Sequence, residues 1–392
     1  TGDGQVFALT GAYNFNTDAF WKNFLRDLEL GQLDNTEGYV CATVRQTGPA
    51  GIGFISMLGW GNAVTILPEM MYRQFGDEEA LPRQYESMKL FVEAEIRKMG
   101  KKNLWIGPSL GDWLAMGKGI AWQAMHNNPV SNAFIVHDLK VISETAERLG
   151  KREDAARYRR QLAATTDAYI KKFVSKNGIV AKDYQSAYIM ALKYVLPEGE
   201  LRERVKKNFV ANIRKNGLQT GFFATEHLLP LLVEAGEQKL AYDVLLQENC
   251  PGWMYQVKCG ATTTWERWDA LKPDGTVNEE KMAGSGENMV SFNHYAFGSV
   301  GEFYYQYILG IRPEKPGFAK LHFAPYPDER LGGVSGSYLS VAGKIESAWR
   351  YEADGCHIRL ATPVEAVVLL PDGRSENVPA GTYEWTVKRP NL

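Results

Sequence analysis

Apolar residues recur every three or four positions along most of the chain, and this spacing predicts amphipathic helices. Asp77 stands before one such stretch, 78–99, as a cap, and Gly100 follows it as a stop. The apolar positions of this stretch are Leu81, Tyr85, Met88, Val92, Ile96 and Met99. We therefore expect a helix over 78–99.

Two glycines separate pairs of helical segments. Gly150 lies between apolar stripes at 135–149 and 155–173, and Gly236 lies between 228–233 and 240–245. Glycine readily adopts the left-handed conformation that ends a helix, so each glycine predicts the turn of an antiparallel helical hairpin. Further helical segments are expected at 5–14, 17–30, 61–75, 184–195, 200–214 and 292–309.

The helical segments number about ten to twelve and share no common sequence period, which argues against a solenoid of true repeats. A closed ring of helical hairpins, an (α/α) barrel, holds that many segments without capping repeats. Loops rich in Gly and Trp, such as 107–119 and 252–264, lie between the pairs. Loops on a rigid scaffold are common places for functional sites.

The pattern changes after Gly310. Four prolines interrupt any helix there, at positions 313, 316, 325 and 327. Short alternating runs follow, with turn signals at 371–373 and 380–381; the runs are 344–350, 357–361, 365–370 and 383–387. We therefore predict a mainly α chain with two domains, a helical barrel at 1–310 and a small antiparallel β-sandwich at 311–392.

Composition excludes several classes of protein. The 44 basic and 46 acidic residues give a net charge of −2, which argues against a general binder of nucleic acid or membrane surfaces. No apolar run of about 18 residues occurs, and the first residues lack the basic and apolar order of a signal peptide. We expect a soluble protein and favour the cytoplasm, while a homodimer stays open.

Metal and cofactor motifs are missing from the sequence. The four cysteines are scattered without a paired spacing, and the six histidines are dispersed. There is no EF-hand loop, phosphate loop or dinucleotide fingerprint. We therefore expect neither a metal nor a cofactor.

Aromatic residues point to a sugar ligand, because the apolar face of a sugar stacks on flat rings while carboxylates take its hydroxyls. The segment 260–269 places Glu266 between Trp265 and Trp268, behind three threonines. Burial there would raise the pKa of Glu266 and suit it to act as a base. An ion pair between Glu266 and Arg267 at a helix start explains the segment equally well. Similar groups at Trp60, Asp112, Trp113, Trp253 and His294 suggest a common cleft.

Four longer motifs occur in series along the helical part: Thr1-Gly2-Asp3-Gly4-Gln5-Val6-Phe7, Gly111-Asp112-Trp113-Leu114, Gly260-Ala261-Thr262-Thr263-Thr264-Trp265-Glu266-Arg267-Trp268, and Asn293-His294-Tyr295-Ala296-Phe297-Gly298-Ser299-Val300-Gly301-Glu302. In this order and spacing they resemble the bacterial α-L-rhamnosidases of glycoside hydrolase family 78. The β-rich tail is similar to the C-terminal domain of that family.

The resemblance implies an (α/α)6 barrel that hydrolyses terminal α-L-rhamnosyl bonds with inversion, in a rhamnosylated small molecule or oligosaccharide. It makes Glu266 the general base and Asp3 a contact to sugar hydroxyls. Trp60, Trp113 and His294 fall where the family lines its pocket. From the residue pattern we add three further candidate sugar contacts, which are Asp112, Trp253 and Trp265.

One catalytic group of the family is missing from the sequence. The family's general acid lies just before the Thr-Gly-Asp motif, and this chain begins at Thr1. The family's leading β-sandwich domains are missing as well, so we expect a fragment or a processed product that is poorly active alone. Asp3 is a weak substitute for the acid. Two alternatives stay open: a catalytically incomplete rhamnose-binding protein, and an (α/α) barrel polysaccharide lyase with a Tyr, His or Arg base.

Overall fold

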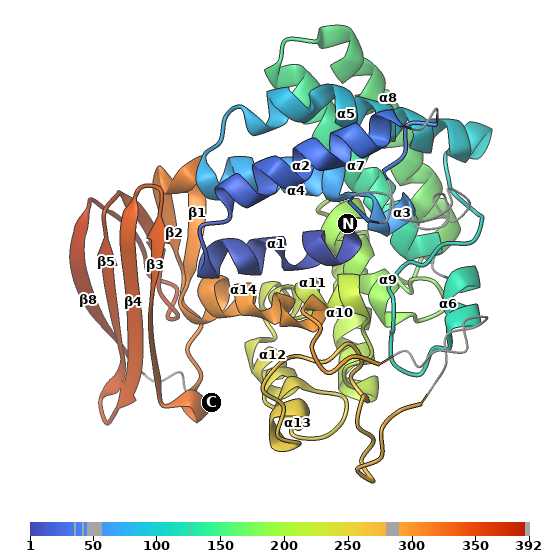
Figure 1. Ribbon diagram of the computed structural model, residues 1–392. Helices are drawn as coiled ribbons and strands as arrows, with labels where there is room; N and C mark the ends of the chain where they lie inside the picture. The colour runs from blue at the N-terminus through green and yellow to red at the C-terminus, as the bar shows by residue number, and fades with distance from the viewer. Residues whose placement is uncertain (35–36, 41–42, 45–56, 127, 280–289, 389–392) are drawn as a thin grey trace. The chain divides into compact units, whose positions relative to one another are not determined.

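A computed structural model describes residues 1–34, 37–40, 43–44, 57–126, 128–279 and 290–388 (Figure 1). The chain divides into two units. The first unit comprises residues 1–7, 22–67 and 81–298, and the second comprises 8–21, 68–80 and 299–392. No helix of the described residues combines the length and the apolar composition needed to cross a membrane.

Helices make up most of the first 308 residues. In chain order they are α1 (Gly2–Asn14), α2 (Asp18–Leu33), α3 (Met57–Trp60), α4 (Ala63–Phe75), α5 (Ala80–Met99), α6 (Ile120–His126), α7 (Asn128–Arg148), α8 (Arg152–Phe173), α9 (Gln185–Met190), α10 (Glu200–Asn216), α11 (Phe222–Glu234), α12 (Gln238–Leu245), α13 (Trp253–Lys258) and α14 (Gly301–Phe303). Stretches of π-helix, Ala191–Val195 and Tyr304–Ile308, extend α9 and α14.

The two predicted hairpins are present. Gly150 turns the chain from α7 into α8, and Gly236 turns it from α11 into α12, with φ angles of 70° and 78°. Nearly all of α7 is buried, whereas α8 buries a single stripe that includes Tyr158 and Tyr169. In a barrel of helical pairs, the inner helix is buried on nearly all sides and the outer helix on one side only. The burial of α7 and α8 therefore matches an inner and an outer helix of the predicted (α/α) fold.

One predicted helix is shorter than expected. The segment 292–309 becomes helical only at Ala296, first as a 3₁₀ turn over Ala296–Val300. The preceding residues lie in irregular backbone, where the His294 N–H donates to the Thr264 carbonyl at 2.9 Å. That hydrogen bond to another segment replaces the bond that a helix would have made.

The start of α11 is capped by a residue far away in the sequence. Asp112 is fully buried, and its carboxylate accepts the backbone N–H groups of Gly221, Phe223 and Ala224 at 2.8, 2.8 and 3.1 Å. Because nearly every residue of α11 is buried, water cannot satisfy these N–H groups. Asp112 therefore supplies the hydrogen bonds that allow this helix to begin inside the protein.

The C-terminal part is a sandwich of two four-stranded sheets. One has the order β1-β2-β6-β7, and the other has the order β3-β4-β5-β8, whose strands lie side by side in Figure 1. The strands are β1 (Ile311–Lys315), β2 (Lys320–Phe323), β3 (Gly333–Ser340), β4 (Gly343–Glu352), β5 (Gly355–Thr362), β6 (Ala366–Leu369), β7 (Ser375–Val378) and β8 (Gly381–Val387). Phe323 and Trp385 stack between the two sheets at 6.1 Å. The predicted sandwich is confirmed, with one parallel pair, β2 with β6, among antiparallel ones.

The second unit also contains helical segments. The Tyr13 hydroxyl, in 8–21, donates to the Ile311 carbonyl at 2.9 Å, and Gln74, in 68–80, donates to the Tyr338 hydroxyl at 2.8 Å. These segments are distant in sequence from the strands, so the alternating pattern after residue 310 could not indicate them. The predicted division of the chain at residue 310 stays a prediction.

We predict that Asp112→Asn lowers the free energy of unfolding by about 1–3 kcal/mol, because the amide turns a donor toward at least one buried N–H group. Urea denaturation measures this loss. Asp243→Asn is the matched control, since the Asp243 side chain is 39% exposed and pairs with Lys239 at 3.0 Å; its effect should stay within about 0.5 kcal/mol. Equal stability of the two variants would contradict the capping role.

Candidate active site

Two irregular segments of the first unit lie side by side and carry the central residues of the site. The Thr264 hydroxyl donates to the His294 carbonyl at 2.7 Å, and the Glu266 N–H donates to the Ser291 carbonyl at 2.9 Å. A threonine of the run that precedes Glu266 therefore binds the backbone of the segment that contains His294. Glu266 does not begin a helix, and the neighbouring Arg267 pairs with Asp269 at 3.1 Å. The hydrogen bonds between the two segments bring Glu266 and His294 close together.

Asp3, Glu266 and His294 form an electrostatic cluster. Asp3 lies in the first turn of α1, and its Oδ2 is 3.8 Å from Nε2 of His294. Burial raises the pKa of Asp3, and His294 opposes that rise. Burial also raises the pKa of Glu266, with a smaller contribution from the charge of Asp3, while His294 acts in the opposite direction. Oδ1 of Asp3 is buried and accepts no hydrogen bond within the described residues, although the Asp3 side chain as a whole is 34% exposed.

The indole ring of Trp60 stands beside α1. Its Nε1 donates to the Gly111 carbonyl at 3.2 Å, and its ring meets Trp113 edge-on at 6.4 Å. A Cβ atom at Gly2 would lie 2.4 Å from Cε3 of Trp60, so only glycine permits this approach. Asp3 directly follows Gly2 in the first turn of the same helix.

Two aromatic residues that we did not predict complete the cluster. Phe222 lies 5.0 Å from His294 and 6.2 Å from Trp60 between ring centroids. Tyr295, which is 46% exposed, stacks on His294 at 5.5 Å. Phe222 is the first residue of α11, is followed by a second phenylalanine, and carries no sequence signal of its own. Tyr295 stands inside a quoted motif, and its exposure could not be read from the sequence.

Three predicted sugar contacts belong to the scaffold. Asp112 caps α11, as described above. Trp253 is 6% exposed, and its Nε1 donates to the Phe297 carbonyl at 2.9 Å. Trp265 is 3% exposed and meets Phe292 edge-on. The sugar contacts of these three residues stay predictions. Trp113 is also buried, behind Trp60.

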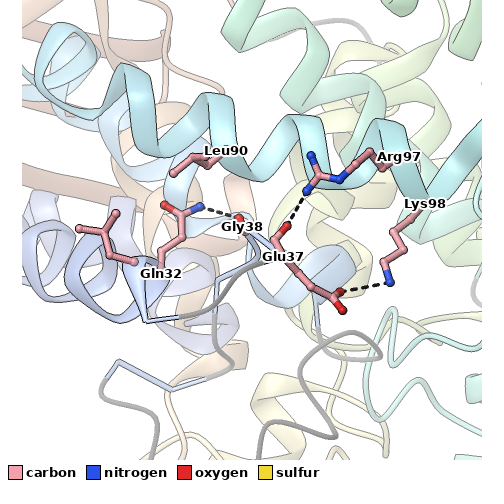
Figure 2. A pocket seen from close by; sticks show the side chains of 7 residues that line it. Gln32, Glu37, Gly38, Leu90, Arg97 and Lys98 are labelled. Carbon is pink, nitrogen blue, oxygen red and sulfur yellow. Dashed lines mark hydrogen bonds and ion pairs between the residues drawn. The ribbon is translucent and has the colours of Figure 1, made fainter.

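A cavity of about 680 Å³ lies elsewhere, between α2 and α5 (Figure 2), and none of the predicted site residues lines it. Arg97 donates to the Glu37 carbonyl at 2.6 Å, and Lys98 pairs with the Glu37 carboxylate at 3.2 Å. Gln32 donates to the Gly38 carbonyl at 2.7 Å. Because these polar groups already bind one another, we assign no ligand to this cavity.

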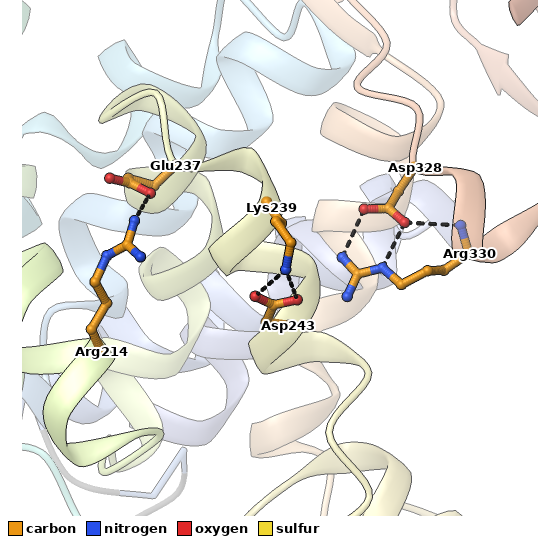
Figure 3. Close-up of polar contacts among 6 residues, drawn as sticks. All are labelled: Arg214, Glu237, Lys239, Asp243, Asp328 and Arg330. Atoms are coloured by element: carbon orange, nitrogen blue, oxygen red, sulfur yellow. Dashed lines mark hydrogen bonds and ion pairs between the residues drawn. The ribbon is translucent and has the colours of Figure 1, made fainter. Parts of the chain in front are cut away.

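Other charged groups show how the cluster differs from ordinary ion pairs. Figure 3 shows the pairs of Arg214 with Glu237 and of Lys239 with Asp243. All four side chains are at least 29% exposed, so water screens their attraction. Glu352, Asp354 and His357 gather on the β4–β5 hairpin closely enough to bind a cation. They are largely exposed, and Asp354 already pairs with His357 at 2.7 Å, so we assign no metal there.

Comparison with known proteins agrees with this fold. The family described as the bacterial alpha-L-rhamnosidase 6 hairpin glycosidase domain matches residues 1–308, and the bacterial alpha-L-rhamnosidase C-terminal domain matches residues 310–383. A curated protein of Alteromonas sp. (strain LOR), named Alpha-L-rhamnosidase, is 32% identical over 377 residues, which are 93% of this chain and 39% of the relative. One of the same name from Formosa agariphila is 31% identical over 98% of this chain and 41% of the relative.

Solved structures give the same result. The crystal structure of Streptomyces avermitilis alpha-L-rhamnosidase complexed with L-rhamnose matches with a TM-score of 0.89 and 29% identity, over 99% of this chain and 38% of that one. The enzyme from Aspergillus terreus matches with a TM-score of 0.88 and 29% identity, over 99% of this chain and 45% of that one. The chain thus spans about two fifths of the length of the curated relatives. It belongs to the bacterial alpha-L-rhamnosidase family, of which it carries the six-hairpin glycosidase domain and the C-terminal domain.

Proposed function

We propose that the protein containing this chain hydrolyses terminal α-L-rhamnosyl bonds with inversion of configuration. The observation that carries the proposal is the half-buried carboxyl group of Glu266 beside Asp3 and His294. Family membership supports the choice of sugar, because the relatives are named Alpha-L-rhamnosidase and one solved relative holds L-rhamnose. The proposed substrate class is a rhamnosylated small molecule or oligosaccharide.

In the proposed reaction Glu266 is the general base. Its carboxylate takes a proton from a water molecule, whose oxygen attacks the anomeric carbon while the bond to the leaving oxygen breaks. A base is more effective when its pKa lies closer to the working pH, and burial moves the pKa of Glu266 in that direction. The positive charge that His294 can carry favours the ionised form that the reaction requires.

Asp3 and Trp60 hold the sugar in this proposal. The exposed part of the Asp3 carboxylate accepts a sugar hydroxyl, since the side chain is 34% exposed. The ring of Trp60 stacks on the apolar face of the sugar. An inverting hydrolase also needs a proton donor roughly 6.5–9.5 Å from the base. The family resemblance puts that donor just before the Thr-Gly-Asp motif, so the proposal assigns it to no residue of this sequence. A homodimer and a cytoplasmic location stay predictions.

The role of Glu266 is tested with 4-nitrophenyl α-L-rhamnoside, whose good leaving group needs the least help from an acid. We expect Glu266→Gln to lower kcat by about 10²–10⁴-fold, the usual contribution of a general base, with little change in the Kd for L-rhamnose. Glu248→Gln is the control, because Glu248 is exposed and pairs with Lys258 at 3.0 Å. A Glu266 variant that keeps more than about a tenth of the wild-type kcat would exclude this role.

The stereochemistry gives a second test. Attack by water on the face opposite the leaving group inverts the anomeric carbon in one step. Proton NMR during the first minutes should therefore show β-L-rhamnose as the first product, before mutarotation. The α anomer as first product would instead require a covalent intermediate. Binding of L-rhamnose without any turnover would favour the catalytically incomplete binding protein.

A further inference from the structure

Two carboxyl groups face each other in the core of the first unit. Glu95 of α5 is 1% exposed and Asp138 of α7 is fully buried. Neither oxygen of Glu95 has a hydrogen-bond donor in the described residues apart from what Asp138 could offer. Two ionised carboxylates in contact, away from water, would be very unfavourable. A single proton between them removes one charge and supplies the missing hydrogen bond.

The surroundings decide which of the two groups stays charged. Asp138 accepts hydrogen bonds from the side chains of Asn62 and Thr65, one on each oxygen. Glu95 has no equivalent donors within the described residues. The pKa of Glu95 lies well above its usual range, first because of burial and then because of the charge of Asp138 and the hydrogen bond with it. The proton therefore resides mainly on Glu95.

Asn62 connects this pair to the candidate active site. Its Oδ1 accepts the Gly59 N–H at 2.6 Å, while its side-chain N–H binds Asp138. The Gly59 carbonyl in turn accepts a hydrogen bond from Gln5 of α1 at 2.7 Å. Gly59 has a φ of 89°, and a Cβ there would lie 3.0 Å from the ring of Phe223. Gly59 directly precedes Trp60 in the sequence. The hydrogen bonds and the close contact of Gly59 therefore fix the backbone from which the Trp60 side chain extends.

We propose that Glu95 and Asp138 share one proton, and that the resulting Asp138 carboxylate positions the Trp60 ring through Asn62. Glu95 and Asp138 are positioning residues and touch no sugar. The proposal rests on the proposed function only where it concerns sugar binding. The shared proton and the position of Trp60 can be measured without any sugar.

Other titratable groups lie around the pair. Nδ1 of His137, on α7, is 3.5 Å from Oδ1 of Asp138, and its ring is 4.6 Å from that of Tyr194. The Tyr194 hydroxyl is 3.1 Å from Nε2 of His227. Burial, then the charges of Lys193 and His137, keep the pKa of His227 well below its usual range. Asn62, just before α4, and Thr65, on α4, bring no charge. All these groups are common to the variants compared below.

The first experiment measures the proton. Because the folded-state pKa of Glu95 is raised, the folded protein keeps a proton that the unfolded chain loses above about pH 4.3. Stability from this group is therefore full below that pH and is lost as pH rises toward the folded-state pKa. Relative to Glu95→Gln, the folding equilibrium constant of the wild type should fall by up to about tenfold per pH unit in this range.

Urea denaturation of the 392-residue chain from pH 4 to 9 provides these constants. Glu86→Gln is the matched control, because Glu86 lies on the same helix with its side chain 70% exposed. Its pH profile should run parallel to that of the wild type. Parallel profiles for the wild type and Glu95→Gln would show that no proton is shared, and would overturn the proposal.

The second experiment follows Trp60 by NMR of tryptophan labelled with ¹⁵N, with the indole signal assigned by Trp60→Phe. Asp138→Asn and the milder Thr65→Val should shift this signal, because each removes a hydrogen bond that holds the Asn62–Asp138 contact. Thr65→Ser keeps the hydroxyl and should restore the wild-type position. Glu95→Gln should leave the signal in place at pH 7, since its amide N–H still binds Asp138. An unshifted signal in both Asp138→Asn and Thr65→Val would overturn the proposal.

Sugar binding separates this proposal from the proposed function. Thr65→Val should weaken L-rhamnose binding by about two- to tenfold, the effect of one lost hydrogen bond, and Thr65→Ser should restore it. If wild-type protein bound no L-rhamnose while the pH profiles and the Trp60 signal behaved as expected, the proposed function would fail and the positioning role would stand. Normal L-rhamnose binding by both Asp138→Asn and Thr65→Val would overturn the positioning role.

Discussion

The site depends on hydrogen bonds between two stretches of irregular backbone. The Glu266 N–H binds the Ser291 carbonyl, and His294 and Thr264 exchange a pair of hydrogen bonds. A helix or strand would fix its side chains through its own regular bonds. Here the two stretches hold each other, and the stretch that carries Glu266 is also tied to α13, where the Gln256 side chain accepts the Trp265 N–H at 3.1 Å. The carboxyl group and the imidazole therefore take their relative position from backbone, and the threonine hydroxyl adds a bond that water would otherwise make.

Burial acts on charged groups in two different ways in this protein. Around Glu266 and Asp3 it is partial, so the carboxyl groups become better bases and acceptors while remaining open to a ligand. At Asp112 it is complete: burial raises the pKa of this carboxyl group too, and the hydrogen bonds it accepts, including three from backbone N–H groups at a helix start, oppose that rise. The same side-chain chemistry thus serves the site in one place and the scaffold in another, according to the donors that surround it.

Local patterns predicted the elements but not their long-range partners. The hairpins at Gly150 and Gly236 could be expected, because apolar spacing and a glycine stop are properties of neighbouring residues. The role of Asp112 could not, since its partners lie more than a hundred residues further along the chain. The motif at Glu266 could be recognised from its sequence, yet Phe222 beside His294 has no local signal. Asp112 and Phe222 take their roles from residues that are distant in sequence and come together only in the folded chain.

The absence of a side chain at Gly2 has a consequence for the shape of the site. The indole ring of Trp60 occupies the space that a Cβ atom at this position would need. Any larger residue would have to push the ring toward Trp113 or away from α1, and Asp3 would move with the helix. The position of the Trp60 ring therefore depends on the absence of a single carbon atom on the neighbouring helix.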